Sequence, residues 1–146
     1  MLKKFLTSLF GPPPPPRVEF TDPLLGILVP EETGWSASVV KGDDTFRCTI
    51  GGDRQPDDAL LAHAHDIFND YTSFKKRVKD FMASASAEYP ADVRAEIAGL
   101  AIDNIALFWP DRPNDGMIFF RGPQDDSRLW RCDYIARTPT GLGCDT

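Results

Sequence analysis

Between residues 17 and 51 the hydrophobic and polar positions follow the pattern of short β-strands. Two apolar stretches are separated by the turn-prone sequence Pro-Glu-Glu-Thr-Gly, and a third, alternating stretch ends at Ile50. Successive residues of a strand point to opposite faces, so Phe46, Cys48 and Ile50 share one face of this third stretch. The pattern predicts a three-stranded meander in which Cys48 is a small core residue.

After residue 56 the hydrophobic spacing changes to alternating four and three, which is typical of a helix. The positions on the predicted helix face are Leu60, Ala64, Ile67, Tyr71, Phe74, Val78, Phe81 and Ala85. Asp57 and Asp58 stand where acidic residues favour a helix N-terminus, and Pro90 prevents the helix from continuing. We therefore expect one long central helix, followed by a short second helix that begins at Pro90 and ends at Gly99.

Strand patterns return between residues 103 and 137. Three stretches, IALFW, MIFFRG and RLWRCDYIA, are separated by polar turns, and Trp130, Cys132 and Tyr134 share one face of the last stretch. Tight turns of this kind favour antiparallel pairing of the strands. The chain is therefore predicted to have an α+β fold, in which two meanders, at about residues 17–51 and 103–137, form one antiparallel sheet covered by the two helices.

The first sixteen residues, which we call the leader, differ from the rest of the chain. Residues 1–11 place large apolar side chains on one face of a helix and polar side chains on the other, and residues 12–16 are consecutive prolines. We expect an amphipathic helix, a polyproline linker and then a single domain over residues 17–146. The residues expected to contact a membrane or a partner are Leu2, Lys3, Lys4, Phe5, Leu6, Leu9 and Phe10.

The charge of the chain limits its partners. The net charge is −6, and because Lys3, Lys4 and Arg17 contribute +3, the residues from 18 onward carry −9. Nucleic acid is not expected to bind this acidic domain, since phosphate recognition requires a clustered basic surface. We expect a protein partner, and a basic one, since opposite charges accelerate association.

Three cysteines, Cys48, Cys132 and Cys144, bear on the compartment and on metal binding. They contain no C-x-x-C pair and leave at least one thiol unpaired, which argues against a zinc ribbon and a disulfide framework. A reducing cytoplasm is the expected location, with peripheral attachment to the inner membrane surface if the leader binds lipid. Cys144, near the chain end, is expected to be the exposed thiol.

Few residues have the spacing of a catalytic or metal site. His63 and His65 stand two apart, so their rings point to different sides of the predicted helix, and His63 with Asp66 is interpreted as a solvated helix face. Paired aspartates occur in turns or at a helix start, where aspartate is favoured for local reasons; they are Asp43–Asp44, Asp57–Asp58 and Asp125–Asp126. We therefore predict no metal, no cofactor and no catalytic residue, and we place Trp109 and Trp130 in the core.

Several short motifs resemble those of a group of small bacterial domains of unknown function. The motifs are Asp22-Pro-Leu-Leu-Gly26-Ile-Leu, Trp35 in the next strand, Leu129-Trp130-Arg-Cys132 and Gly141-Leu-Gly-Cys-Asp145. The resemblance covers about residues 20–146 and leaves the leader outside. It implies a central helix with a terminal sheet and, since some relatives of that group occur beside toxin and immunity loci, an immunity-like role. It implies no active site.

Together these observations favour a non-enzymatic module that binds another protein. Two alternatives stay open: a small-molecule enzyme centred on Cys144 or on the His63/Asp66 turn, and a membrane-surface adaptor that uses the leader. A deep polar pocket around those side chains would indicate the enzyme, whereas a flat acidic face would indicate protein binding.

Overall fold

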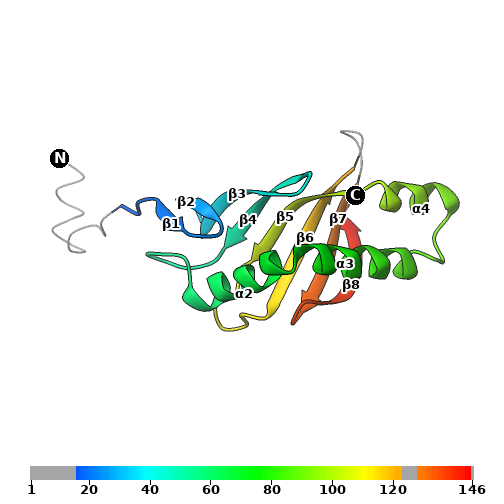
Figure 1. Ribbon diagram of the computed structural model, residues 1–146. Coiled ribbons are helices and arrows are strands. Elements are labelled where there is room, and N and C mark those ends of the chain that lie inside the picture. Colours follow the sequence, from blue (N-terminus) through cyan, green and yellow to red (C-terminus); the bar gives the residue numbers. More distant parts are fainter. Residues whose placement is uncertain (1–15, 123–127, 146) are drawn as a thin grey trace, which may run out of the picture.

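The computed structural model describes residues 16–122 and 128–145, which form eight strands and three helices (Figure 1). The strands are β1 (Phe20–Asp22), β2 (Gly26–Pro30), β3 (Trp35–Lys41), β4 (Asp44–Ile50), β5 (Ala101–Leu107), β6 (Asp115–Arg121), β7 (Leu129–Ile135) and β8 (Thr138–Asp145). The helices are α2 (Asp58–Asn69), α3 (Tyr71–Ala85) and α4 (Ala91–Ala98), and all three lie between β4 and β5 in the chain. The predicted α+β fold is confirmed.

The eight strands form one sheet in which each strand lies beside its neighbours in the sequence, from β1 to β8. Neighbouring strands are antiparallel except β4 and β5, which are parallel. A parallel pair needs a long crossover connection, and the three helices supply it. The two predicted meanders are therefore confirmed, and the parallel pair joins them into one sheet.

The first meander contains one strand more than the pattern predicted, because the apolar stretch at residues 21–30 divides into β1 and β2. Asp22 Oδ2 accepts hydrogen bonds from the N–H groups of Leu24 and Leu25, at 2.9 and 2.8 Å, and Gly26 has a φ of 77°. A carboxylate that pairs with the backbone N–H groups after it stabilises a turn in place of a continuous strand.

The second meander continues past residue 137 into β8, so the predicted end of the sheet is wrong. Ala136 and Arg137 form the turn between β7 and β8, with φ values of 50° and 64°. Two-residue turns of this kind usually contain glycine or asparagine, because a β-carbon disfavours the left-handed region. The sequence therefore has no hairpin signal here, and the pairing of β8 with β7 compensates for the strained turn.

The predicted long central helix is also wrong, because two helices, α2 and α3, meet at Asp70. The backbone of Asp70 has φ −130° and ψ 38°, and its N–H bonds to the carbonyl oxygen of Ile67, three residues back. Aspartate is a poor residue for a helix interior, since its side chain competes for backbone hydrogen bonds. After the break Met82 is buried, whereas the predicted core positions Phe81 and Ala85 are half-buried and exposed.

The core lies between the sheet and the helices α2 and α3, which lie over one face of it (Figure 1). The short helix α4 packs against α3 at the edge of the sheet, so the prediction that it covers the sheet is wrong (Figure 1). The predicted inward-facing sets are confirmed as buried: Phe46, Cys48 and Ile50 in β4, and Trp130, Cys132 and Tyr134 in β7. Aromatic rings join the two layers, with ring centroids 5.8 Å apart for Phe46 and Phe68 and 5.3 Å apart for Phe74 and Tyr134.

The predicted start of the helical region at Asp57 and its predicted end at Gly99 are both confirmed. Asp57 accepts a hydrogen bond from the N–H of Leu60 at 3.1 Å, which caps the first turn of α2. Gly99 follows the last residue of α4, as predicted for the second helix. The carboxylate of Asp57 thus caps the start of the helical segment, and the segment ends where the sequence has Gly99.

The predicted amphipathic helix at residues 1–11 and linker residues 12–15 lie outside the described residues, as do Asp125 and Asp126. Over residues 16–122 and 128–145, no helix combines the length and the apolar character that a membrane crossing requires. The predictions about the leader therefore stay predictions.

Candidate functional site

Three connections meet at one end of the sheet because β4 and β5 are parallel and end there together. They are residues 31–34, between β2 and β3, residues 51–57, between β4 and α2, and residues 108–114, between β5 and β6. The N–H of Gly51 bonds to the carbonyl oxygen of Leu107 at 2.7 Å, which ties two of these connections. They enclose a depression of about 550 Å³.

An exposed aromatic pair lies at this end of the sheet. Phe108 is 37% exposed and Trp109 is half-buried, with their rings edge to face at a centroid distance of 5.7 Å. The guanidinium carbon of Arg112 lies 4.5 Å from the centroid of the Trp109 ring. The prediction of a core position is confirmed for Trp130 and wrong for Trp109, since β5 ends at Leu107 and the chain turns out of the sheet before the ring.

Arg17 holds the segment before β1 at the same end of the sheet as the aromatic pair. Its guanidinium donates to the carbonyl oxygens of Gly34 at 3.3 Å and Asp53 at 3.4 Å, and also to that of Glu31. It lies 5.5 Å from the ring centroid of Trp35. Neutral carbonyl partners hold this arginine, so it neutralises no carboxylate by a direct ion pair.

An acidic rim borders the aromatic pair. Glu32 and Asp53, which line the same depression as the two rings, are exposed, and their carboxylates take part in no ion pair among the residues that the structure describes. We call the whole arrangement the Trp109 surface; it consists of Arg17, Glu32, Asp53, Phe108, Trp109 and Arg112. It combines exposed aromatic area with unpaired negative charge on connections that contact one another closely.

A second depression, of about 300 Å³, lies beside Trp109 and Arg112. It extends from these two side chains along the neighbouring strands to Met117 and Asp133. Ile135, at the end of β7, also lines it and is 52% exposed. Trp109 therefore lines two depressions, and both contain apolar and charged side chains.

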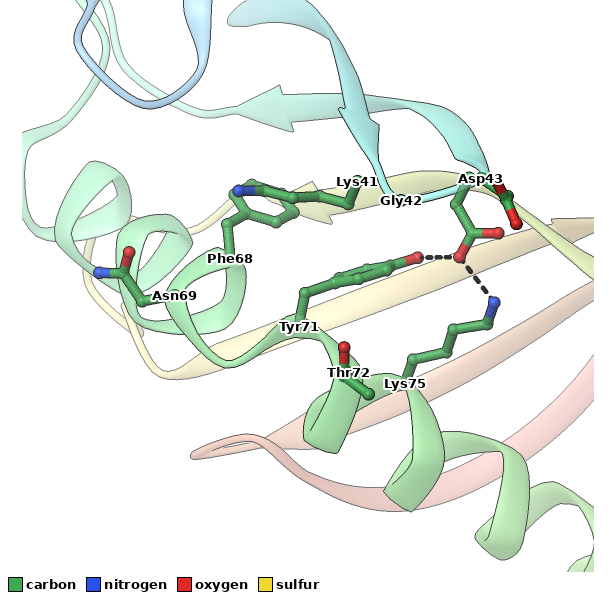
Figure 2. Close-up of a pocket in the computed structure, with 9 residues that line it drawn as sticks. Lys41, Gly42, Asp43, Phe68, Asn69, Tyr71, Thr72 and Lys75 are labelled. Carbon is green, nitrogen blue, oxygen red and sulfur yellow. Dashed lines mark hydrogen bonds and ion pairs between the residues drawn. The ribbon is translucent and has the colours of Figure 1, made fainter.

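A third depression, of about 410 Å³, lies between the β3–β4 turn and the start of α3 (Figure 2). Figure 2 shows Tyr71 and Lys75 reaching from α3 toward the turn that contains Gly42 and Asp43. The hydroxyl of Tyr71 and the ammonium of Lys75 each donate to Asp44 Oδ2 at 2.7 Å. These contacts hold the hairpin against the helix.

Asp44 and Tyr71 keep their ordinary protonation states in this third depression. The hydrogen bond from Lys75 is the main reason that the pKa of Asp44 lies below its usual value, although burial opposes it. Burial, together with the bond to Asp44, raises the pKa of Tyr71 well above its usual value. Asp44 therefore stays a carboxylate and Tyr71 a neutral phenol at neutral pH, and neither shift brings a pKa toward 7.

The two histidines point to different sides of α2, as predicted, but neither lies on a solvated face of the kind expected for His63. His63 is 6% exposed, and its ring stacks on Tyr134 with centroids 5.7 Å apart and an interplanar angle of 11°. His65 contacts Asp22 of β1. The expectation for His63 is wrong because β7 lies against its side of the helix, which helical periodicity alone does not reveal.

Among residues 16–122 and 128–145, no group of three or more potential metal ligands comes together. Cys144 is exposed, as expected, and lies in β8 opposite Trp130. Comparisons of the chain with protein-family models, curated protein sequences and solved structures found no match.

Sequence reasoning missed the Trp109 surface. A signal was present, because Phe108 and Trp109 stand directly before Pro-Asp-Arg-Pro-Asn-Asp, a sequence whose two prolines indicate a loop. A large aromatic residue beside a loop of this kind is a candidate for an exposed contact residue. Arg17 and the residues 31–34 gave no comparable signal, since only the strand order brings them beside Trp109.

Proposed function

We propose that this chain is a protein-binding module and that its partner docks on the Trp109 surface. The observation that carries the proposal is the partly exposed pair Phe108 and Trp109, held beside unpaired carboxylates on connections that contact one another. Tryptophan and arginine are enriched among the residues that contribute most to binding energy, and Trp109 and Arg112 lie together here. Trp109 lines two depressions, and a partner that inserts side chains into both of them buries the ring.

We propose a basic protein as the partner. Glu32 and Asp53 line the same depression as the aromatic pair, and the whole chain carries a net charge of −6. Opposite charge around an apolar centre speeds encounter and selects among partners, while the apolar centre supplies most of the affinity. An immunity-like inhibitor that binds a basic enzyme is one form of this function.

The alternative of a small-molecule enzyme has less support. A general acid or base works best when its pKa lies near the working pH. At Asp44 the pKa is lowered, and at Tyr71, Cys48 and Cys132 it is raised, so all four shifts lead away from neutrality. These directions favour structural roles for the four groups.

The test is to isolate the partner and then to measure its affinity for surface variants. The full chain is used to capture proteins from an extract of its own cells, and a basic protein so identified is purified and titrated. Trp109→Ala is expected to weaken the dissociation constant about tenfold to a hundredfold, the range of a central interface tryptophan. Glu32→Gln/Asp53→Asn is expected to slow association and to reduce its dependence on salt.

The matched control is Glu88→Gln/Asp92→Asn, which removes the same charge from exposed positions near α4. It should leave the affinity unchanged. Unfolding curves establish that each variant keeps the native fold. If the partner binds the Trp109→Ala and Glu32→Gln/Asp53→Asn variants as tightly as the native chain, the proposed surface is wrong.

A further inference from the structure

A groove between α3 and α4 is built differently from the Trp109 surface and uses none of its residues. One face of α3 supplies Lys79, Met82 and Ala83, and the facing side of α4 supplies Arg94, Ile97 and Ala98. These positions recur three and four residues apart, so each set forms one stripe along its helix. The groove has a volume of about 340 Å³, and two of its lining residues, Met82 and Ile97, are buried.

The two cations that line the groove have no carboxylate partner among the described residues. The ammonium of Lys79 donates to the carbonyl oxygen of Leu100 and lies 5.5 Å from the ring centroid of Phe120. The guanidinium of Arg94 donates to the carbonyl oxygen of Tyr89 at 2.8 Å. Both groups thus have donors left over for an anion.

Two other lysines of α3, unlike Lys79, form ion pairs with carboxylates. Lys75 and Lys76 each place their ammonium 2.7 Å from a carboxylate oxygen, of Asp44 and Asp80. Lys79 is half-buried, and burial, followed by the repulsion of Lys75, lowers its pKa, although the more distant carboxylate of Asp44 opposes this. A partly desolvated ammonium that has no carboxylate in direct contact is stabilised by an anion bound next to it.

We propose that this groove binds a small carboxylate that carries an apolar chain or ring. The carboxylate lies between Lys79 and Arg94, where charge-assisted hydrogen bonds are the strong ones. The apolar part lies over Met82 and Ile97, between the small side chains of Ala83 and Ala98, which leave room for it. A volume of this size matches a small ligand, and an apolar lining with a few charged groups is the usual composition of such a site.

The probes are octanoate and 4-phenylbutyrate, with 1-octanol as the neutral comparison. Each is titrated into the full-length chain, and binding is followed by the NMR shifts of backbone amides in α3 and α4. We expect saturable shifts from the two carboxylates and affinity at least about tenfold weaker for 1-octanol, because the alcohol lacks the charge. Failure of both carboxylates to give saturable shifts in these helices overturns the proposal, as does equal affinity for 1-octanol.

Variants assign the binding to the groove. Lys79→Met is expected to weaken octanoate binding about tenfold, and Arg94→Gln to weaken it less, since Arg94 is the more exposed cation. The matched control Lys76→Gln, which removes an exposed lysine of the same helix, should bind as the native chain does. Ala98→Phe keeps both cations and fills the groove from an exposed position, so its binding should be abolished. Native affinity in both Lys79→Met and Ala98→Phe overturns the proposal.

Discussion

His65 of α2 and Asp22 of β1 lie in direct contact, with Nε2 of the imidazole 2.8 and 2.9 Å from the two carboxylate oxygens. Asp22 is 4% exposed. Burial alone would raise the pKa of this carboxyl group, but hydrogen bonds from the N–H groups of Leu25 and Leu24, together with His65, hold the pKa below its usual value of 3.8. The pair fastens the first hairpin to the helical layer.

Asp22→Asn is expected to lower the free energy of unfolding by about 2 kcal/mol, because an amide replaces a buried carboxylate that three donors share. Urea unfolding followed by circular dichroism measures the change. Glu19→Gln, at an exposed neighbouring position, is the control and should change stability by less than about 0.5 kcal/mol. Equal effects of the two substitutions would contradict the role assigned to Asp22.

Acid is expected to destabilise the protein through His63. Burial lowers the pKa of His63 below its usual 6.5, with Arg137 adding to the effect and Asp66 opposing it. The unfolded chain therefore binds a proton near pH 6.5 that the folded chain does not accept until the pH is lower. The free energy of unfolding falls as the pH drops below about 6.5, by up to about 1.4 kcal/mol per pH unit.

His63→Phe isolates this contribution because phenylalanine keeps a flat ring against Tyr134 and has no proton to bind. Unfolding curves at pH 7, 6 and 5 are compared for the variant and the native chain. The variant should gain stability relative to the native chain as the pH falls. A constant difference over this range would show that His63 does not control the acid response.

Asp22 also makes the protein less stable in acid, but at a lower pH than His63 does. Its folded pKa lies below the unfolded value of 3.8, so its contribution to stability is present above pH 3.8 and is lost as the pH falls through the folded pKa. The Asp22→Asn variant should therefore lose less stability than the native chain below pH 4. Parallel curves for the two proteins in this range would contradict the linkage.

The three thiols are expected to react in a fixed order. Burial raises the pKa of Cys48 to about 12 and that of Cys132 to about 12, whereas Cys144 is exposed. Since the thiolate is the reacting form, iodoacetamide should modify Cys144 first in the native protein. Mass mapping of a time course checks the order, and labelling in denaturant shows that all three thiols can react. Native labelling of Cys48 or Cys132 at the rate of Cys144 would disprove the assignment.

Gly116→Ala is expected to destabilise the domain by about 2 to 4 kcal/mol, the range of severe overpacking. A β-carbon on Gly116 would lie 2.2 Å from the hydroxyl oxygen of Tyr134, and the Tyr134 ring is held between His63 and Phe74. Gly99→Ala is the matched control, because its β-carbon would meet no atom closer than 3.7 Å. Thermal unfolding of both variants measures the difference, and similar melting temperatures would refute the argument.

The leader is expected to attach the chain weakly and reversibly to anionic membranes. In the predicted helix, one face carries five large apolar side chains, which would supply roughly 5 kcal/mol before the cost of ordering, and Lys3 and Lys4 would add attraction to acidic lipid. In vesicle flotation at low salt the full chain should rise, whereas Phe5→Asp/Leu9→Asp and a chain starting at Arg17 should stay behind. If the full chain also stays behind, the membrane role is wrong, and a partner's apolar groove becomes the better hypothesis for the leader.

Local patterns were sufficient to predict the two meanders and the helical region between them. Alternation in β4 and β7 depends only on the geometry of a strand, so the inward positions of Cys48 and Cys132 were readable without knowing the fold. The helix start at Asp57 was readable for the same reason, because its side chain satisfies a local backbone N–H, and α4 ends at Gly99 as the sequence indicated. The resemblance to the bacterial group and the immunity-like role stay predictions.

Only the tertiary structure decided where the chain breaks these local rules and which surfaces result. The turn at Ala136 and Arg137 has unfavourable left-handed residues, and it forms because the pairing of β8 with β7 outweighs their strain. His63 is buried because β7 lies against α2, a contact between segments about seventy residues apart. The Trp109 surface exists because the parallel pair brings three connections to one end of the sheet. The parallel pairing of β4 with β5 joins segments far apart in the sequence, and no local pattern of residues records it.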